Sequence, residues 1–105
     1  QKIGYNAFYN RVSLENITLP STVTEIGDYA FAGCSNLREV TLNDGLQKIG
    51  IRAFQDCTSL QSITLPSTVT EIGSNAFHGC RNLRGVTFNE GLQKIGDGAF
   101  YNCTS

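Results

Sequence analysis

The chain is 105 residues long and carries eight basic and nine acidic residues, for a formal net charge of −1. This balance gives no electrostatic footprint for nucleic acid or for an anionic membrane, and no run of residues approaches the roughly 20 apolar residues of a membrane span. We therefore expect no nucleic-acid partner and no membrane insertion. The length allows one domain with a modest core, and we assign residues 1–105 to a single domain.

A 23-residue repeat runs through the chain. The dipeptide Ala-Phe returns at this step, Ile-Gly begins four residues before each of these alanines, and columns of Leu and Cys keep the same period. The unit reads LxxΦTΦxxxΦxxIGxxAFxxCxx, where Φ is apolar, and about four and a half copies are present. A period of this length predicts a solenoid, because each repeat can bury its apolar side only against the next coil.

In chain order, each repeat predicts two extended segments and one compact turn. The run LxxΦTΦ alternates, with Ile17 on the inner face and Thr18 on the outer face, and this pattern predicts a strand. A turn at residues 20–22 or 43–45 leads into a second extended segment, such as residues 23–26. We expect the glycine after that segment to adopt a backbone conformation that a Cβ atom would forbid. The AFxxC piece is too short for an independent helix and predicts one helical or 3₁₀ turn.

A second period, of two repeats, lies on top of the first. Repeats alternate between LPSTVTEIG and a version with Asn-Asp-Gly or Asn-Glu-Gly at the turn. One column consequently alternates in charge along the stack: Lys2, Glu25, Lys48, Glu71, Lys94. Because the signs alternate, each charged side chain lies next to one of opposite charge in the adjacent repeat. A slip of the pairing by one repeat would place like charges next to each other. We interpret the column as a register device, worth about 0.2–1 kcal/mol per exposed pair, rather than as a charged recognition stripe.

These repeats resemble the BspA-like, treponemal-type leucine-rich repeats, whose pattern LxxIxLPxxVTxIGxxAFxxC matches essentially the whole chain. The resemblance implies a leucine-rich repeat right-handed β-solenoid, with parallel strands on the concave side and short 3₁₀ or turn segments on the convex side. It also implies a secreted or cell-surface protein, because the family is associated with adhesion to host proteins and to other cells. One departure from the pattern is Arg11, which occupies a cysteine position.

The cysteines occupy one column of the repeat: Cys34, Cys57, Cys80 and Cys103. Side chains in one column point the same way, and such parallel neighbours rarely reach disulfide geometry. A metal ion would need ligands that converge on one point instead of lying along a line. We predict four free, buried thiols, no metal site and no cofactor.

The sequence gives no support for catalysis. His78 is the only histidine, and it lies at a variable position with no Cys, Asp or Glu fixed beside it in the repeat. No nucleophile elbow and no phosphate-cradling glycine loop is present. We predict that the protein is not an enzyme and has no catalytic residues. The threonine column that contains Thr18 is interpreted as strand packing rather than as an ice-binding rank, since its neighbouring column alternates Pro and Asn.

The positions that differ between repeats suggest where a partner would bind. Three lie beside the threonine column and four lie in or just before the AFxx segment, and together they form our candidate partner-binding set: Asn16, Glu39, Ser62, Tyr29, Arg52, His78 and Tyr101. Aromatic and arginine side chains are the common anchors of interfaces. Neutral drift at solvated positions predicts the same variation, so both readings stay open at this point.

We predict a non-catalytic protein-binding or adhesion scaffold whose partner is a host or cell-surface protein. The alternative is a structural spacer or assembly unit with no ligand of its own. The chain begins and ends within a repeat and lacks polar terminal caps. These uncapped ends predict either that the segment belongs to a longer array or that it self-associates through its ends.

Overall fold

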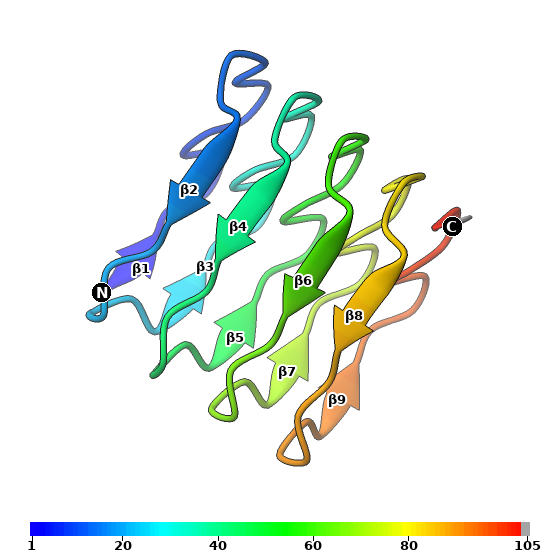
Figure 1. Ribbon diagram of the computed structural model, residues 1–105. Helices are drawn as coiled ribbons and strands as arrows, with labels where there is room; N and C mark the ends of the chain where they lie inside the picture. Colours follow the sequence, from blue (N-terminus) through cyan, green and yellow to red (C-terminus); the bar gives the residue numbers. More distant parts are fainter. Residues whose placement is uncertain (104–105) are drawn as a thin grey trace.

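The computed structural model describes residues 1–103, and every strand pairing within them is parallel. The strands are short: β1 (Lys2–Ile3), β2 (Asn16–Thr18), β3 (Glu25–Ile26), β4 (Glu39–Thr41), β5 (Lys48–Ile49), β6 (Ser62–Thr64), β7 (Glu71–Ile72), β8 (Gly85–Thr87) and β9 (Lys94–Ile95). Figure 1 shows the coils stacked side by side, with the even-numbered strands on one face and the odd-numbered strands on the other. We name these the front face and the back face. The predicted repeat solenoid with two extended segments per coil is confirmed.

The strand positions follow from the alternation of side chains. In β6, Ile63 is buried whereas Ser62 and Thr64 on either side of it are exposed. Each strand pairs with the equivalent strand of the next repeat, so that Ile26 lies against Ile49 on the back face. Each apolar side chain is therefore covered by its own copy in the neighbouring coil, and this contact is what a single repeat cannot supply.

The AFxxC segment forms successive tight turns, so the expected turn segments are confirmed, but no helical or 3₁₀ turn is present in the described residues. Ala30 donates its N–H to the Gly27 carbonyl, but Phe31 donates to Ala53 in the next coil, with an N–O distance of 2.7 Å. Tyr29 has a positive φ of 60°, which a right-handed helix does not allow. Because alternate amides bond along the chain and between coils, the segment extends the ladder instead of closing into a helix.

The Ile-Gly glycine is required by close packing, and the predicted special backbone conformation is wrong. The glycines of positive φ are others: Gly33, Gly45, Gly79 and Gly98. At Gly50, a Cβ atom would lie 2.7 Å from the Gly27 carbonyl carbon and 2.7 Å from the Ile26 oxygen. Backbone atoms of the preceding coil occupy the space, so a side chain has no room.

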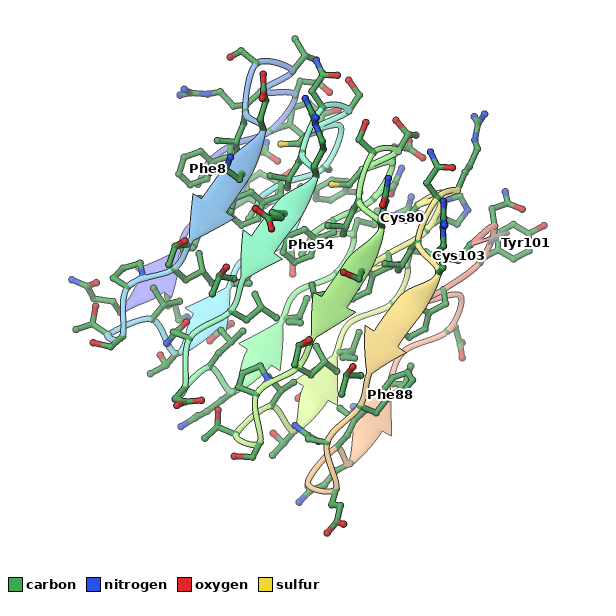
Figure 2. The ribbon with its side chains drawn as sticks, viewed as in Figure 1. Phe8, Phe54, Cys80, Phe88, Tyr101 and Cys103 are labelled. Atoms are coloured by element: carbon green, nitrogen blue, oxygen red, sulfur yellow. The ribbon has the colours of Figure 1, made fainter. Side chains whose placement is uncertain are left out.

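A column of phenylalanine rings forms the centre of the core. The Phe54 ring lies parallel to the rings of Phe31 and Phe77, at centroid distances of 5.1 and 5.3 Å. Phe8 and Phe100 continue the stack at its two ends, and Figure 2 labels Phe8 and Phe54 within it. Rings offset in parallel are a favourable aromatic arrangement, so the stack adds to the free energy gained by burial.

The cysteine column runs beside the phenylalanine stack, and all four thiols are free, as predicted. Cys34, Cys57 and Cys80 are buried, whereas Cys103 in the last coil is only partly buried. The Cys57 thiol donates to the Phe31 carbonyl, with an S–O distance of 3.2 Å, and the other cysteines repeat this bond. The thiols therefore act as small core side chains that also donate a hydrogen bond.

We expect all four thiols to resist reagents in the native protein at pH 8. Burial raises the pKa of Cys34, and it raises the pKa of Cys103 to about 11, so that little thiolate forms at this pH. Cys103 is the most accessible and should react first, at a rate that rises as the pH approaches 11.

Thiol counting with a chromogenic disulfide reagent after denaturation, without reductant, should find four groups. A count of two or none would contradict the free-thiol column.

The charge column is in the predicted register, although its ion pairs form two by two. Lys2 pairs with Glu25 at 3.6 Å and Lys48 with Glu71 at 3.9 Å, between nitrogen and oxygen. Glu25 lies beside Lys48 in the strand register, but no ion pair joins them within the part of the chain that the structure describes. Ion pairs therefore join two of the four pairs of adjacent side chains in this column, and the expectation that each side chain pairs with both of its neighbours is only half met.

We expect Lys48→Glu to lower the free energy of unfolding by about 1 kcal/mol at low salt, because it places three carboxylates in succession. The Lys48 side chain is 44% exposed, so most of the loss should disappear at high salt. Urea unfolding at two salt concentrations measures the effect, with Lys48→Gln as the control that removes the cation without adding repulsion. Equal stability of the two variants at low salt would show that the column does not set register.

Candidate protein-binding face

The front face is not one continuous sheet. β2 pairs with β4 and β6 pairs with β8, whereas the odd-numbered strands form one five-stranded sheet across the back. Where front strands pair, Leu19 donates its N–H to Thr41 at 3.0 Å, and Leu65 donates to Thr87 at the same distance. The equivalent amide of Leu42 has no backbone acceptor, and no backbone hydrogen bond joins β4 to β6 in the described residues. We name this interruption the β4–β6 junction.

Asparagine side chains flank each paired front rung. The amide group of Asn36 donates to a carbonyl of the preceding coil at 2.7 Å on one side of β4, and Asn43 donates to the Val23 carbonyl at 2.8 Å on the other. Asn82 and Asn89 repeat this arrangement two repeats later, on either side of β8. The two-repeat period of the sequence thus places a pair of side-chain tethers at every second step.

The β4–β6 junction keeps one of these tethers and lacks the other. Ser59 takes the place of Asn36 and donates to the equivalent carbonyl of the preceding coil, that of Ser35, at 2.7 Å, but Pro66 takes the place of Asn43. Proline offers neither a side-chain donor nor a backbone N–H. The next contact across this step comes from Thr68, whose hydroxyl donates to the Leu46 carbonyl on the far side of the turn. The coils therefore stay attached on the back while the front rung is left open.

Two hollows lie on the front face. One has a volume of about 440 Å³ and is lined by Glu15, Asn16, Arg38, Glu39, Gln61 and Ser62. The other has a volume of about 360 Å³, lies along the β4–β6 junction, and is lined by Glu39, Val40, Thr41, Leu42, Asp44, Ser62, Ile63, Thr64 and Pro66. Glu39 and Ser62 line both, so the hollows adjoin each other. The structure thereby brings together three predicted residues, Asn16, Glu39 and Ser62.

The other four predicted residues lie in the turns that follow the back strands, and they contact neighbours there. The Tyr29 ring meets two tyrosine rings of the preceding coil edge-on, at 5.9 and 6.4 Å. Arg52 donates to a glutamine of its own turn at 2.8 Å. His78 stacks on Tyr101 at 5.2 Å between ring centroids. These side chains thus form a separate group and line neither hollow.

Most residues that line the junction hollow are not among the predicted positions. Thr41 and Thr64 belong to the threonine column, which the sequence assigns to strand packing, and Asp44 and Pro66 belong to predicted turns. The alternating Pro and Asn column was a usable signal, because Asn43 tethers its rung and Pro66 cannot. The sequence alone does not show that the asparagine amide reaches the neighbouring coil, as Asn43 does.

No group of three or more His, Cys, Asp or Glu side chains in residues 1–103 is placed to hold a metal ion. The same residues include no helix with the length and hydrophobicity of a membrane span. Hydroxyl, amide and carboxylate groups line the two front-face hollows beside aliphatic side chains.

The comparisons agree with this architecture. A leucine-rich repeat protein of T. pallidum superposes with a TM-score of 0.96 at 40% identity, covering 97% of this chain and 48% of that one. A leucine-rich repeat protein of Bacteroides ovatus gives a TM-score of 0.81 at 35% identity, with 98% and 32% of the two chains covered. A leucine rich cell surface protein of Faecalibacterium prausnitzii gives 0.58 at 27% identity, with 98% and 40% covered. The chain spans less than half the length of each structure.

No curated protein matches the sequence. The sequence does match the BspA type leucine rich repeat region, in six copies that cover residues 1–105. The repeat pattern, the parallel coils and the structural neighbours agree, and the chain belongs to the BspA-type leucine-rich repeat family.

Proposed function

We propose that this chain is a non-catalytic protein-binding module of a secreted or cell-surface repeat protein, and that the front face binds the partner. The observation that carries the proposal is the pair of adjoining hollows on that face, which include the variable positions Asn16, Glu39 and Ser62. On the back face, the space between coils is filled by backbone at each Ile-Gly position, as at Gly50. On the front face, a polypeptide partner finds surface relief together with polar groups.

The cell-surface location and the adhesive role rest on the family and on one neighbour. The Faecalibacterium prausnitzii protein is described as a cell surface protein, and its chain is more than twice as long as the part matched here. We extend that location to the parent of this segment, with a host or cell-surface protein as its partner. Residues 1–105 form one domain of the array in this proposal.

Matched pairs of substitutions test the face. Asn16→Arg with Ser62→Arg adds two positive charges and bulk to the front, and Thr24→Arg with Thr70→Arg adds the same charges to exposed positions beside the back strands. A protein captured from cell-surface extracts by the wild-type chain is purified and titrated against all three forms. We expect the front variant to bind at least about tenfold more weakly and the back variant to bind as the wild type does.

Two outcomes contradict the proposal. If the front variant binds its partner as tightly as the wild type, the partner uses another surface, and the Tyr29 turn group becomes the next candidate. If the wild-type chain itself captures no protein, the chain acts as the spacer that the sequence left open as an alternative. Circular dichroism of each variant verifies that the fold is intact before affinities are compared.

A further inference from the structure

The β4–β6 junction differs from every other step of the solenoid. The back strands and the turns remain bonded from coil to coil, as in the Phe54 to Ala76 bond at 2.7 Å, but the front rung is open. Leu42 and Gln61, whose equivalents donate across the paired rungs, have no backbone acceptor. Backbone groups left without a partner in the chain seek one in water or in a ligand. The hollow of about 360 Å³ lies along this same junction.

The charge at the junction has one sign. Glu39 and Asp44 are the only ionisable residues among those that line this hollow, and both are exposed. The ion pairs in residues 1–103 link Lys or Arg to other carboxylates, so neither of these two is neutralised by a pair. Such an unpaired acidic rim attracts a cationic partner and repels phosphate groups of nucleic acids or lipids.

The remaining lining suits the stem of a long basic side chain. Val40, Leu42 and Pro66, which are partly exposed, supply aliphatic surface, and Thr41 and Thr64 supply hydroxyl groups. The methylene groups of lysine or arginine gain from lying on apolar surface while the charged end reaches a carboxylate. An acidic side chain would lose both contacts, since it is short and of the wrong sign.

The spacing of the two carboxylates suggests an extended ligand. Asp44 lies five positions after Glu39, and at about 3.3 Å per extended residue their Cα atoms are at most roughly 16 Å apart. In an extended peptide, side chains four residues apart point to the same side and lie about 13 Å from each other. We propose that the β4–β6 junction binds an extended segment of the protein partner with lysine or arginine side chains four residues apart. This inference rests on the proposed function and adds the chemistry of the partner.

A peptide titration tests the inference without the natural partner. The probe is the capped peptide Lys-Ser-Val-Thr-Lys, and two controls are Glu-Ser-Val-Thr-Glu and the same lysine composition with adjacent lysines, Ser-Lys-Lys-Val-Thr. Titrations are followed by amide chemical shifts in ¹⁵N-labelled chain. We expect shifts from the probe to gather at residues 39–44 and 61–65, and to be weak or absent with either control. Raising the salt to 0.5 M should weaken binding of the probe.

Variants of the chain complete the test. Glu39→Gln with Asp44→Asn should weaken binding of the probe at least about tenfold, because both carboxylates are lost at little change in volume. Glu90→Gln is the matched control, since Glu90 takes the place of Asp44 two repeats later and lines neither hollow. Equal binding by the wild type and by the Glu39→Gln, Asp44→Asn variant, or equal shifts from the acidic peptide, would overturn the inference.

The two proposals fail separately. In one case, the captured partner needs Asn16 and Ser62, but the probe peptide causes no change in the amide chemical shifts at the junction. This result would overturn the basic-segment inference and keep the front face as the binding surface. A partner that ignores the front substitutions would instead overturn the proposed function. Loss of that partner in the Glu39→Gln, Asp44→Asn variant, together with its retention by Glu90→Gln, supports both.

Discussion

Replacing Phe54 by alanine is expected to lower the free energy of unfolding by about 3–5 kcal/mol, the largest loss for any single change considered for this chain. The side chain is fully buried and stacks on Phe31 and Phe77, so the substitution leaves a cavity in the middle of the column and removes two ring contacts. Equilibrium unfolding in urea measures the difference. In a domain of this size, a loss of several kcal/mol is a large fraction of the total stability.

Phe88→Ala is the control for this prediction. The same residue type is removed, but Phe88 is 50% exposed and meets only the edge of the Phe100 ring. Figure 2 labels it at the last front strand, β8. We expect a cost of about 1 kcal/mol or less, since little area is returned to water. Similar losses in the two variants would mean that the phenylalanine stack is not the centre of the core.

Gly50→Ala is expected to destabilise the protein by about 3 kcal/mol, through steric overlap and not through backbone strain. The added methyl group would meet backbone atoms of Gly27 and Ile26 at 2.7 Å, and backbone cannot move aside as a flexible side chain can. The coils would have to separate locally, which weakens the adjoining back strands. Thermal and urea unfolding both report this loss.

Gly4→Ala separates the two explanations for this glycine column. Gly4 follows Ile3 as Gly50 follows Ile49, but it lies in the first coil, and a Cβ atom there has nothing within 4 Å. We expect Gly4→Ala to be neutral or to stabilise by a few tenths of a kcal/mol, because alanine reduces the entropy of the unfolded chain. If both variants lost stability equally, a backbone conformation shared by the column would be the cause.

The solenoid could be predicted from the sequence because the repeat constrains every column at once. Residues such as Ile26 and Phe31 recur at one step, and only stacked coils bury all copies together. The turn geometry could not be predicted in the same way. Tyr29 and Arg52 have φ values of 60° and 57°, which residue type alone does not favour. Hydrogen bonds to the next coil hold them there, and a local reading of AFxxC does not include those bonds.

The candidate binding face was predictable in part for a related reason. Variation between repeats indicated Asn16, Glu39 and Ser62, because solvated columns are free to differ. The open junction depends instead on whether one side chain spans the gap between two coils, as Asn43 does and Pro66 does not. That is a property of distances between coils, and the sequence shows only the alternation that produces it.

Native-state hydrogen exchange, resolved by residue with NMR, tests most directly whether the front face is open at the β4–β6 junction. The amides of Leu19 and Leu65 bond across paired rungs and should be protected, whereas the equivalent amide of Leu42 should exchange at least about tenfold faster. Gln61 should likewise exchange faster than Arg84, which donates to the Gln61 carbonyl at 2.9 Å. Protection of Leu42 and Gln61 equal to that of their counterparts would show a continuous front sheet and would contradict the account of the binding face.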